Sequence, residues 1–300
     1  MASLPVIGWI GAGRMGVPMA RFILQAGYPL VVFSRDPANR QKLVSHGASE
    51  AASVMACARA ADIVFSSLSD DHALREVALG PEGLLAHARR GAVFVDTSTV
   101  STEVSAEVDR QAAQHGVAYL RIPISGNAAS AERGEVTALV SGPEPAWNIV
   151  KPVVQTFSQA QTYLGAGDEA RSMKLVINLL VVTTAQALAE ALALGRKAGL
   201  RWDLLLDTIA LSTIASPWLK LKAGLMKRRD FTPTMTTRLI LKDMDLILAA
   251  ARASGVPTPL TSATRQVMQT AIGEGYGEED YMAIVKLAEK QSGLSTEEME

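Results

Sequence analysis

The chain has 300 residues, of which 48% are hydrophobic and 20% charged, and its formal net charge is −1. This length fits two domains better than one core, and the low net charge gives no basic field for nucleic acid or for an anionic membrane. Cys57 is the only cysteine, so no intramolecular disulfide can form. The sequence starts without a signal segment, and no Cys/His cluster has the spacing of a metal site. We therefore expect a cytoplasmic protein without a metal.

A glycine-rich turn near the N-terminus is the strongest motif. The apolar run at residues 6–10 predicts a buried strand, the residues after 16 predict a helix, and the three glycines between them spell G-x-G-x-x-G: Gly11, Gly13 and Gly16. In a dinucleotide site the first glycine permits a tight turn, the second lets a pyrophosphate approach the backbone, and the third lets the helix pack closely on the strand. The pyrophosphate would lie at the helix N-terminus, where free N–H groups and the helix dipole favour an anion.

The end of the second predicted strand, residues 30–33, bears on the choice between NAD and NADP. In this fold an acidic residue at that point binds the ribose hydroxyl of NAD, whereas a nearby arginine accommodates the 2′-phosphate of NADP. Ser34 is small and uncharged, and Arg35 follows it. We therefore expect NADP. NAD stays possible because a small shift of the loop would turn Asp36 toward the ribose.

Strand and helix patterns alternate through the first half of the chain. Further apolar runs predict strands at residues 62–68, 92–95, 117–120 and 134–142. This alternation favours parallel βα units with right-handed crossovers. The loops after two of these strands, at Leu68 and Thr99, would lie at the carboxyl edge of the sheet, where ligands bind in this fold.

A turn at Ser125, Gly126 and Asn127 offers N–H groups, a hydroxyl and an amide, which are good partners for a small carboxylate. The same residues are common in ordinary loops, so the turn alone could either bind a carboxylate or be purely structural.

The pattern becomes helical after Gly165–Gly167. A long, mostly apolar helix is predicted from Glu169 to about Ala198, and later helices are expected at residues 202–211, 236–253, 260–272 and 281–290. We therefore expect an α/β Rossmann domain at residues 1–166 and an all-helical domain at residues 167–300, joined by the long helix. Polar residues interrupt its apolar run, which favours a helix buried in protein over a membrane span. Because it is apolar on more than one face, we expect a homo-oligomer, a dimer or tetramer, formed through the helical domain.

Lys174 and Asn178 are four residues apart on this helix and share one face. A lysine among apolar neighbours either snorkels to water or has a function. Near a cofactor, its ammonium could give a proton to the alkoxide that forms when hydride reaches a carbonyl, and burial would lower its pKa toward the useful range. From the residues alone, an alternative interpretation stays open, in which Lys174 only snorkels to water and Asn178 only packs between helices. Because the sequence lacks a Tyr-x-x-x-Lys motif and a His–Asp acid/base motif, Lys174 is the best acid/base candidate.

Together these motifs resemble the β-hydroxyacid dehydrogenase family, which includes 3-hydroxyisobutyrate dehydrogenase and tartronate semialdehyde reductase. The glycine turn, with Arg14 and Met15, matches its cofactor fingerprint, and residues 80–84 are similar to its G-x-x-G-L. Residues 96–99 resemble its D-x-S-T loop, and residues 123–126 match most of its substrate motif, D-A-P-V-S-G-G. Residues 174–178 match K-x-x-x-N, whose lysine is catalytic in that family, and Lys242 begins a later K-D motif near the nicotinamide.

The resemblance implies a site between the two domains, with Lys174 as general acid/base. It implies substrate contacts from Ser125, Gly126, Asn127 and Asn178, and cofactor contacts from Gly11, Gly13, Arg14, Met15, Gly16, Ser34, Arg35, Leu68, Thr99 and Lys242. The main departures lie in the substrate motif, where Arg121-Ile122 replace Asp-Ala and Asn127 replaces the second glycine. A side chain at position 127 would crowd or re-pattern the carboxylate site.

We therefore expect an NADP-preferring oxidoreductase that interconverts a small 3-hydroxy acid and its semialdehyde or keto form. Its partners would be the substrate, the cofactor and further copies of the chain, and not a membrane or nucleic acid. Two alternatives stay open: reduction of C=N bonds, as in imine reductases, and a nucleotide-binding module without catalysis.

Overall fold

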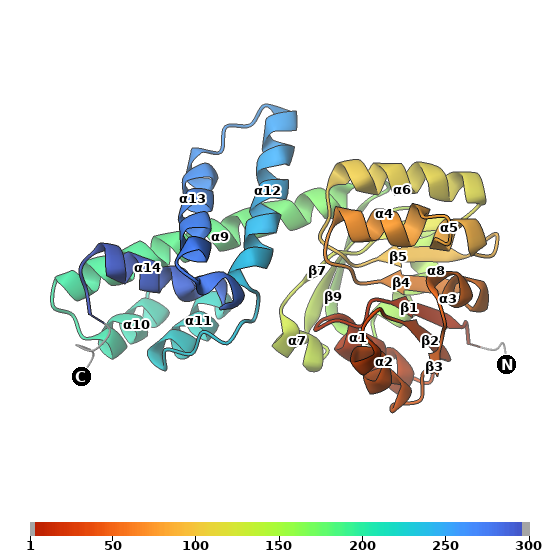
Figure 1. Ribbon diagram of the computed structural model, residues 1–300, viewed down its shortest axis with the longest axis horizontal. Helices are drawn as coiled ribbons and strands as arrows, with labels where there is room; N and C mark the ends of the chain where they lie inside the picture. The colour runs from red at the N-terminus through yellow and green to blue at the C-terminus, as the bar shows by residue number, and fades with distance from the viewer. Residues whose placement is uncertain (1–3, 296–300) are drawn as a thin grey trace. The chain divides into compact units, whose positions relative to one another are not determined.

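The computed structural model describes residues 4–295 of the chain (Figure 1). The chain divides into two compact units, Met1–Leu175 and Val176–Glu300. This division falls inside helix α9 (Glu169–Lys197), whose ends lie within one residue of the predicted ends. The predicted domain boundary between residues 166 and 167 stays a prediction.

The described residues of the first unit form a nine-stranded sheet in the order β3-β2-β1-β4-β5-β6-β8-β7, in which β9 also pairs with β8. The strands are β1 (Ile7–Ile10), β2 (Leu30–Phe33), β3 (Ser49–Glu50), β4 (Ile63–Ser66), β5 (Val93–Asp96), β6 (Ala118–Arg121), β7 (Ile124–Ser125), β8 (Val136–Ser141) and β9 (Ser158–Gly165). From β3 to β6 all neighbouring pairs are parallel. The carboxyl ends of these strands therefore meet at one edge of the sheet.

Helices cover both faces of this sheet (Figure 1). They are α1 (Gly16–Gln25), α2 (Pro37–Val44), α3 (Val54–Ala60), α4 (Asp71–Leu79), α5 (Leu84–His87), α6 (Thr102–His115), α7 (Ala128–Glu132) and α8 (Glu144–Val154). On one face α1, α2, α7 and α8 bury a core around Trp9, which stacks on Phe65 with 5.3 Å between ring centroids. On the other face α3, α4, α5 and α6 bury a second core that includes Phe94. The expected doubly covered α/β domain is confirmed.

The expectation of parallel units throughout the first half is wrong at one side of the sheet. Strand β8 runs antiparallel to β6 and β7. Only ten residues connect β7 to β8, which is too short for the crossover that a parallel pair needs. Strand β9, which runs parallel to β8, was missed by the sequence analysis because it has no run of apolar residues and half of its residues are exposed.

The second unit is helical, as predicted. Its elements are the C-terminal part of α9, then α10 (Trp202–Leu211), α11 (Pro217–Lys227), α12 (Thr237–Ser254), α13 (Pro259–Gly273), two short 3₁₀ turns at Tyr276–Glu278 and Tyr281–Ala283, and α14 (Ile284–Gln291). They bury one apolar core, which includes Leu192, Met244 and Met268. Among the described helices only α9 is long and apolar enough to cross a membrane, and half of its apolar window is buried inside the protein. That burial is what a core helix of a globular protein shows.

Candidate functional site

The three glycines of the N-terminal motif lie at the turn from β1 into α1, and each has a different environment. Gly11 has a φ of 93°, and a Cβ there would lie 2.3 Å from the carbonyl oxygen of Ser67. A Cβ on Gly16 would lie 2.2 Å from the carbonyl oxygen of Gly11. A Cβ on Gly13, by contrast, would meet no atom of residues 4–295 within 4 Å. Gly11 and Gly16 are therefore required by the fold, whereas the absence of a side chain at Gly13 keeps space open beside the backbone.

This open space lies at the N-terminus of α1. The helix starts after Met15, no side chain of the described residues caps it, and its first turn holds no acidic residue. Uncapped N–H groups at a helix N-terminus bind phosphate groups well, because they add hydrogen bonds to the positive end of the dipole. The turn therefore fits the pyrophosphate of a dinucleotide. Arg14 is exposed in the same turn.

The loop after β2 carries the residues expected to choose the cofactor. The side chain of Arg35 is 79% exposed, and its guanidinium lies 4.0 Å from the carboxylate of Glu76. Ser34 is buried, and its carbonyl accepts a hydrogen bond of 2.6 Å from Arg40. Asp36 caps α2: its carboxylate accepts hydrogen bonds from the Ala38 amide and from Asn39. In this arrangement the acidic side chain is occupied by the helix, and the arginine extends into solvent.

The loops that hold Leu68 and Thr99 follow β4 and β5, and one side chain joins them. The Ser98 hydroxyl accepts a hydrogen bond of 2.8 Å from the Leu68 amide and donates one of 2.6 Å to Asp96. Asp96 is fully buried and also accepts a hydrogen bond of 2.6 Å from Ser66. The two predicted cofactor loops are therefore held together at the carboxyl edge of the sheet.

The turn at residues 125–127, which is predicted to bind substrate, has a fixed backbone. Gly126 has a φ of 150°, and a Cβ there would lie 2.6 Å from the Ser130 hydroxyl, so a glycine is needed. The Asn127 carboxamide oxygen accepts a hydrogen bond of 2.9 Å from the Ser130 amide, and the Ser130 hydroxyl accepts one from the Asn127 amide. These reciprocal bonds form a capping box at the start of α7. The cap therefore uses the oxygen of Asn127, and any role with substrate falls to its Nδ2 group.

Lys174 and Asn178 lie one turn apart on α9. Lys174 is partly buried, whereas Asn178 is only 5% exposed. The Asn178 carboxamide donates a hydrogen bond of 2.7 Å to the carboxylate of Asp243, which is itself buried. The other carboxylate oxygen of Asp243 accepts no hydrogen bond from the described residues, although that oxygen lies 3.0 Å from the Lys242 ammonium. The K-D motif was predicted from the sequence to contribute Lys242 alone. Asp243 is the residue that orients Asn178.

Two buried arginines near the start of α9 were absent from the predicted site. Arg171 pairs with Asp96, and Arg121 pairs with Asp168 over 3.0 Å. Arg121 was noted in the sequence only as a departure from the substrate motif, and its partner stands 47 residues further along the chain. No local sequence pattern predicts such ion pairs.

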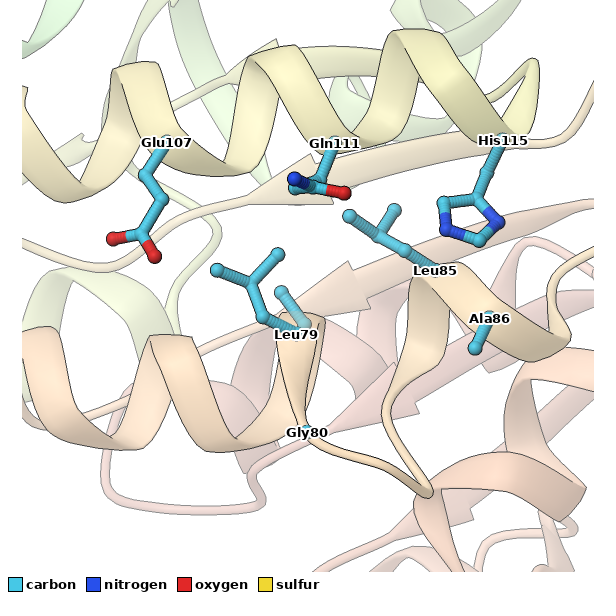
Figure 2. A pocket seen from close by; sticks show the side chains of 8 residues that line it. Leu79, Gly80, Leu85, Ala86, Glu107, Gln111 and His115 are labelled. Carbon is cyan, nitrogen blue, oxygen red and sulfur yellow. The ribbon is translucent and has the colours of Figure 1, made fainter.

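A cleft of about 300 Å³ lies between α4, α5 and α6, apart from all of these residues. Figure 2 shows Glu107, Gln111 and His115 of α6 on one side and Leu79 of α4 on the other. Glu107 is already bound by Arg75 over 2.8 Å. Because α4 starts after the carboxyl end of β4, its last residues lie toward the opposite edge of the sheet. None of the predicted site residues lines this cleft.

Comparison with known proteins decides the family. Residues 6–165 match the model of the NAD binding domain of 6-phosphogluconate dehydrogenase, and residues 165–288 match the NAD-binding domain of NADP-dependent 3-hydroxyisobutyrate dehydrogenase. The chain is 32% identical over 290 residues to 2-(hydroxymethyl)glutarate dehydrogenase of Eubacterium barkeri, covering 96% of both chains. The chain belongs to the β-hydroxyacid dehydrogenase family.

Solved structures of similar proteins have the same fold. The crystal structure of 3-hydroxyisobutyrate dehydrogenase from Salmonella typhimurium is 27% identical, with a TM-score of 0.86 over 94% of this chain and 99% of the other. A structure of Psf3 with NADP+ and 2-OPP is 25% identical, with a TM-score of 0.85 over 94% of this chain and 99% of the other. The present β-hydroxyacid dehydrogenase is therefore an NAD(P)-dependent oxidoreductase that acts on CH–OH groups, and the expected family and fold are confirmed.

Proposed function

We propose that this chain is an NADP-preferring oxidoreductase that interconverts a small 3-hydroxy acid and its semialdehyde or keto form, with Lys174 as general acid/base. The observation that carries the proposal is the arrangement on α9. Lys174 and Asn178 share one helix face, and the buried Asp243 fixes the Asn178 amide. An acid/base group beside a fixed amide suits a substrate oxygen that changes between carbonyl and hydroxyl.

The residues divide the chemistry as follows. The glycine turn, with Arg14 and Met15, and the loops at Leu68 and Thr99 would hold the cofactor, and Lys242 would lie near its nicotinamide. When bound, the reduced nicotinamide supplies hydride to the carbonyl carbon. The Lys174 ammonium donates a proton at Nζ to the carbonyl oxygen as negative charge develops there. In the oxidation direction the neutral amine takes that proton back.

The substrate would be held by polar groups on both sides of Lys174 in sequence. The Ser125 hydroxyl, the Gly126 backbone and the Asn127 Nδ2 group can bind a carboxylate, because hydroxyl and N–H groups donate to its oxygens. Asn178 presents an amide whose orientation is set by Asp243. A small acid fits these short polar side chains, and 2-(hydroxymethyl)glutarate and four-carbon semialdehyde acids belong to this chemical class.

The preference for NADP rests on the loop after β2. The carboxylate of Asp36 is used by the helix cap, so it does not compete for the ribose hydroxyl. The Arg35 guanidinium extends into solvent and suits a 2′-phosphate. Arg40, which is bound to the Ser34 carbonyl and to Glu50, fixes the loop that presents Arg35.

We also propose that the chain forms a homo-oligomer through α9. Three of its leucine and valine side chains are exposed in the second unit: Val176 at 55%, Leu180 at 60% and Leu194 at 73%. Their spacings of 4 and 14 residues place them on one stripe of the helix. Large apolar side chains along one stripe are typical of an interface. Light scattering of the purified protein tests this proposal, and a monomer would contradict it.

We also propose a cytoplasmic location, because the buried Cys57 is a free thiol and free thiols are typical of a reducing compartment.

The proposed activity is tested by the oxidation of NADPH and NADH, side by side at one pH, with glyoxylate, malonic semialdehyde and succinic semialdehyde. Oxidation of 2-(hydroxymethyl)glutarate and 3-hydroxyisobutyrate tests the reverse direction. We expect turnover with at least one carbonyl acid and a higher kcat/KM with NADPH. Turnover with cyclic imines alone, or cofactor binding without turnover, would contradict the proposal.

A further inference from the structure

The first turn of α9 is joined to the strand ends through one fully buried side chain, Arg171. Its guanidinium pairs with the Asp96 carboxylate at the end of β5 and donates to the Ser98 carbonyl in the following loop. It also donates a hydrogen bond of 2.9 Å to the Tyr119 hydroxyl on β6. Burial raises the pKa of Tyr119 to about 12, so its hydroxyl stays protonated at neutral pH. One side chain of α9 thus contacts two neighbouring strands and a predicted cofactor loop.

Asp96 connects this arginine to both cofactor loops. One carboxylate oxygen accepts hydrogen bonds from Ser66 and Ser98, and the other pairs with Arg171. Ser98 in turn accepts a hydrogen bond from the Leu68 amide. Burial on its own would lower the pKa of Arg171, but its partners Tyr119 and Asp96 outweigh burial and raise it. Loss of Arg171 or of Asp96 would leave the other residue buried without its counterion.

A second buried arginine secures the residue just before α9. Arg121 is 1% exposed, and its guanidinium contacts the carboxylates of Asp168 and Asp109 over 3.0 and 3.1 Å. The Ser105 hydroxyl donates to Asp168 and lies within hydrogen-bond distance of Arg121 and Arg171. The two arginines therefore belong to one network. This network accounts for the departure at Arg121, since the charged partner that it needs is supplied by Asp168.

Arg171 lies three residues before Lys174, about 4.5 Å along the helix axis and on the same face. We infer that Arg171 is a positioning residue, which ties the helix segment of Lys174 to the cofactor loops at Leu68 and Thr99 through Asp96 and Ser98. This inference deepens the proposed function and rests on it. The pair sets where the Lys174 ammonium stands relative to a bound cofactor, and cofactor binding in turn steadies the first turns of α9.

The same helix offers a matched control. Arg196 also forms a buried ion pair, with Glu289 over 2.8 Å, and its side chain is 7% exposed. It lies 22 residues after Lys174, about 33 Å along the helix. Replacing either arginine by glutamine removes one buried charge and costs stability, less at Arg196 because Glu289 keeps Arg229 over 2.8 Å. Only the change at Arg171 should alter the position of Lys174.

The test compares Arg171→Gln, Arg196→Gln and the double variant Asp96→Asn/Arg171→Gln with the wild type. The readouts are Tm, kcat with saturating NADPH and the best carbonyl acid of the panel, and NADPH affinity from fluorescence. Both single variants should lose Tm. Arg171→Gln should lose about 10²-fold in kcat, because a misplacement of about 1 Å has that effect, whereas Arg196→Gln should stay within twofold. The double variant should regain Tm, since no buried charge is left unpaired, but not kcat.

A merely structural role predicts different results. If kcat returns together with Tm in the double variant, or if Arg196→Gln loses as much kcat as Arg171→Gln, the inference is overturned.

A second readout separates this inference from the proposed function. Hydrogen exchange of residues 171–178 should slow when NADPH binds to the wild type and to Arg196→Gln, but not when it binds to Arg171→Gln. Absence of this slowing in the wild type would overturn the inference. If the wild type turns over no substrate of the panel, the proposed function fails. The exchange measurement still tests the inference in that case, because it requires NADPH binding and no turnover.

Discussion

The two sides of the sheet in the first unit work in different ways. On the side of β1, β2 and β4, backbone geometry makes the site: Gly11 and Gly16 are required by close contacts, and Gly13 leaves room for a ligand. On the side of β5, β6 and the start of α9, two buried arginines pair with carboxylates that are distant in sequence. The first kind of site is encoded in six consecutive residues. The second depends on residues that meet only after folding, so it can differ between relatives without a change in the glycine motif.

The largest expected effect comes from removing the proposed acid/base group. Lys174→Ala should lower kcat about 10²- to 10⁴-fold, because proton transfer to the carbonyl oxygen would lose its donor. NADPH affinity should stay within about twofold. Steady-state kinetics and NADPH fluorescence measure the two quantities. Lys197→Ala, an exposed lysine on the same helix, serves as the control and should leave both unchanged. Full turnover in Lys174→Ala would refute the assigned role.

The glycine turn offers a pair of variants that separate binding from folding. A Cβ at position 13 meets no described atom, so Gly13→Ala should keep Tm but weaken NADPH binding roughly tenfold, about 1.4 kcal/mol. A Cβ at position 16 would strike the Gly11 carbonyl, so Gly16→Ala should lower Tm as well. Thermal denaturation and NADPH titration measure the pair. Unchanged NADPH affinity in Gly13→Ala would show that the cofactor does not approach this backbone.

A smaller effect is expected where the loop after β2 meets α4. Arg35→Ala should raise the KM for NADPH about fivefold and leave that for NADH unchanged, since only NADPH carries the 2′-phosphate. Glu76, whose carboxylate lies 4.0 Å from Arg35, would repel that phosphate. Glu76→Gln should therefore lower the KM for NADPH about twofold. Equal changes for both cofactors in Arg35→Ala would remove the basis for an NADP preference.

A further effect concerns the core rather than the site. Burial raises the pKa of the Cys57 thiol from 9.0 to about 12. Between these values the unfolded chain releases the proton while the folded chain keeps it. The free energy of unfolding should therefore fall as pH rises above 9, by up to about 1.4 kcal/mol per pH unit from this group. Urea denaturation at pH 8 to 10.5 measures the slope. Cys57→Ala should reduce it, and an identical slope in that variant would contradict the assignment.

The sequence predicted the elements whose side chains follow a clear period. Helix α9 was placed to within one residue at each end, and α10 at both ends, because apolar residues recur along them at helical spacing. Helix α11 was missed even though Ser216 and Pro217 are a typical cap and first residue. Strand β9 carries no alternating pattern, since its exposed residues are mostly polar and pair with β8 at one edge of the sheet.

The site divides in the same way. Gly11, Gly13 and Gly16 could be named in advance because their function lies in the local backbone. Arg171 could not, because its partners stand 52 to 75 residues away in sequence and only the folded sheet brings them together. The role of Asn127 with substrate stays a prediction, and no spacing rule showed that its oxygen would cap α7.

The central claim is that hydride passes from a nicotinamide to the carbonyl carbon of a small acid on this chain. The most direct measurement is mass spectrometry of the product formed from malonic semialdehyde with NADPH deuterated at the transferring position of C4. The account predicts 3-hydroxypropionate one mass unit heavier, with label lost from the cofactor in equal amount. Consumption of the deuterated cofactor without label in the acid would contradict it.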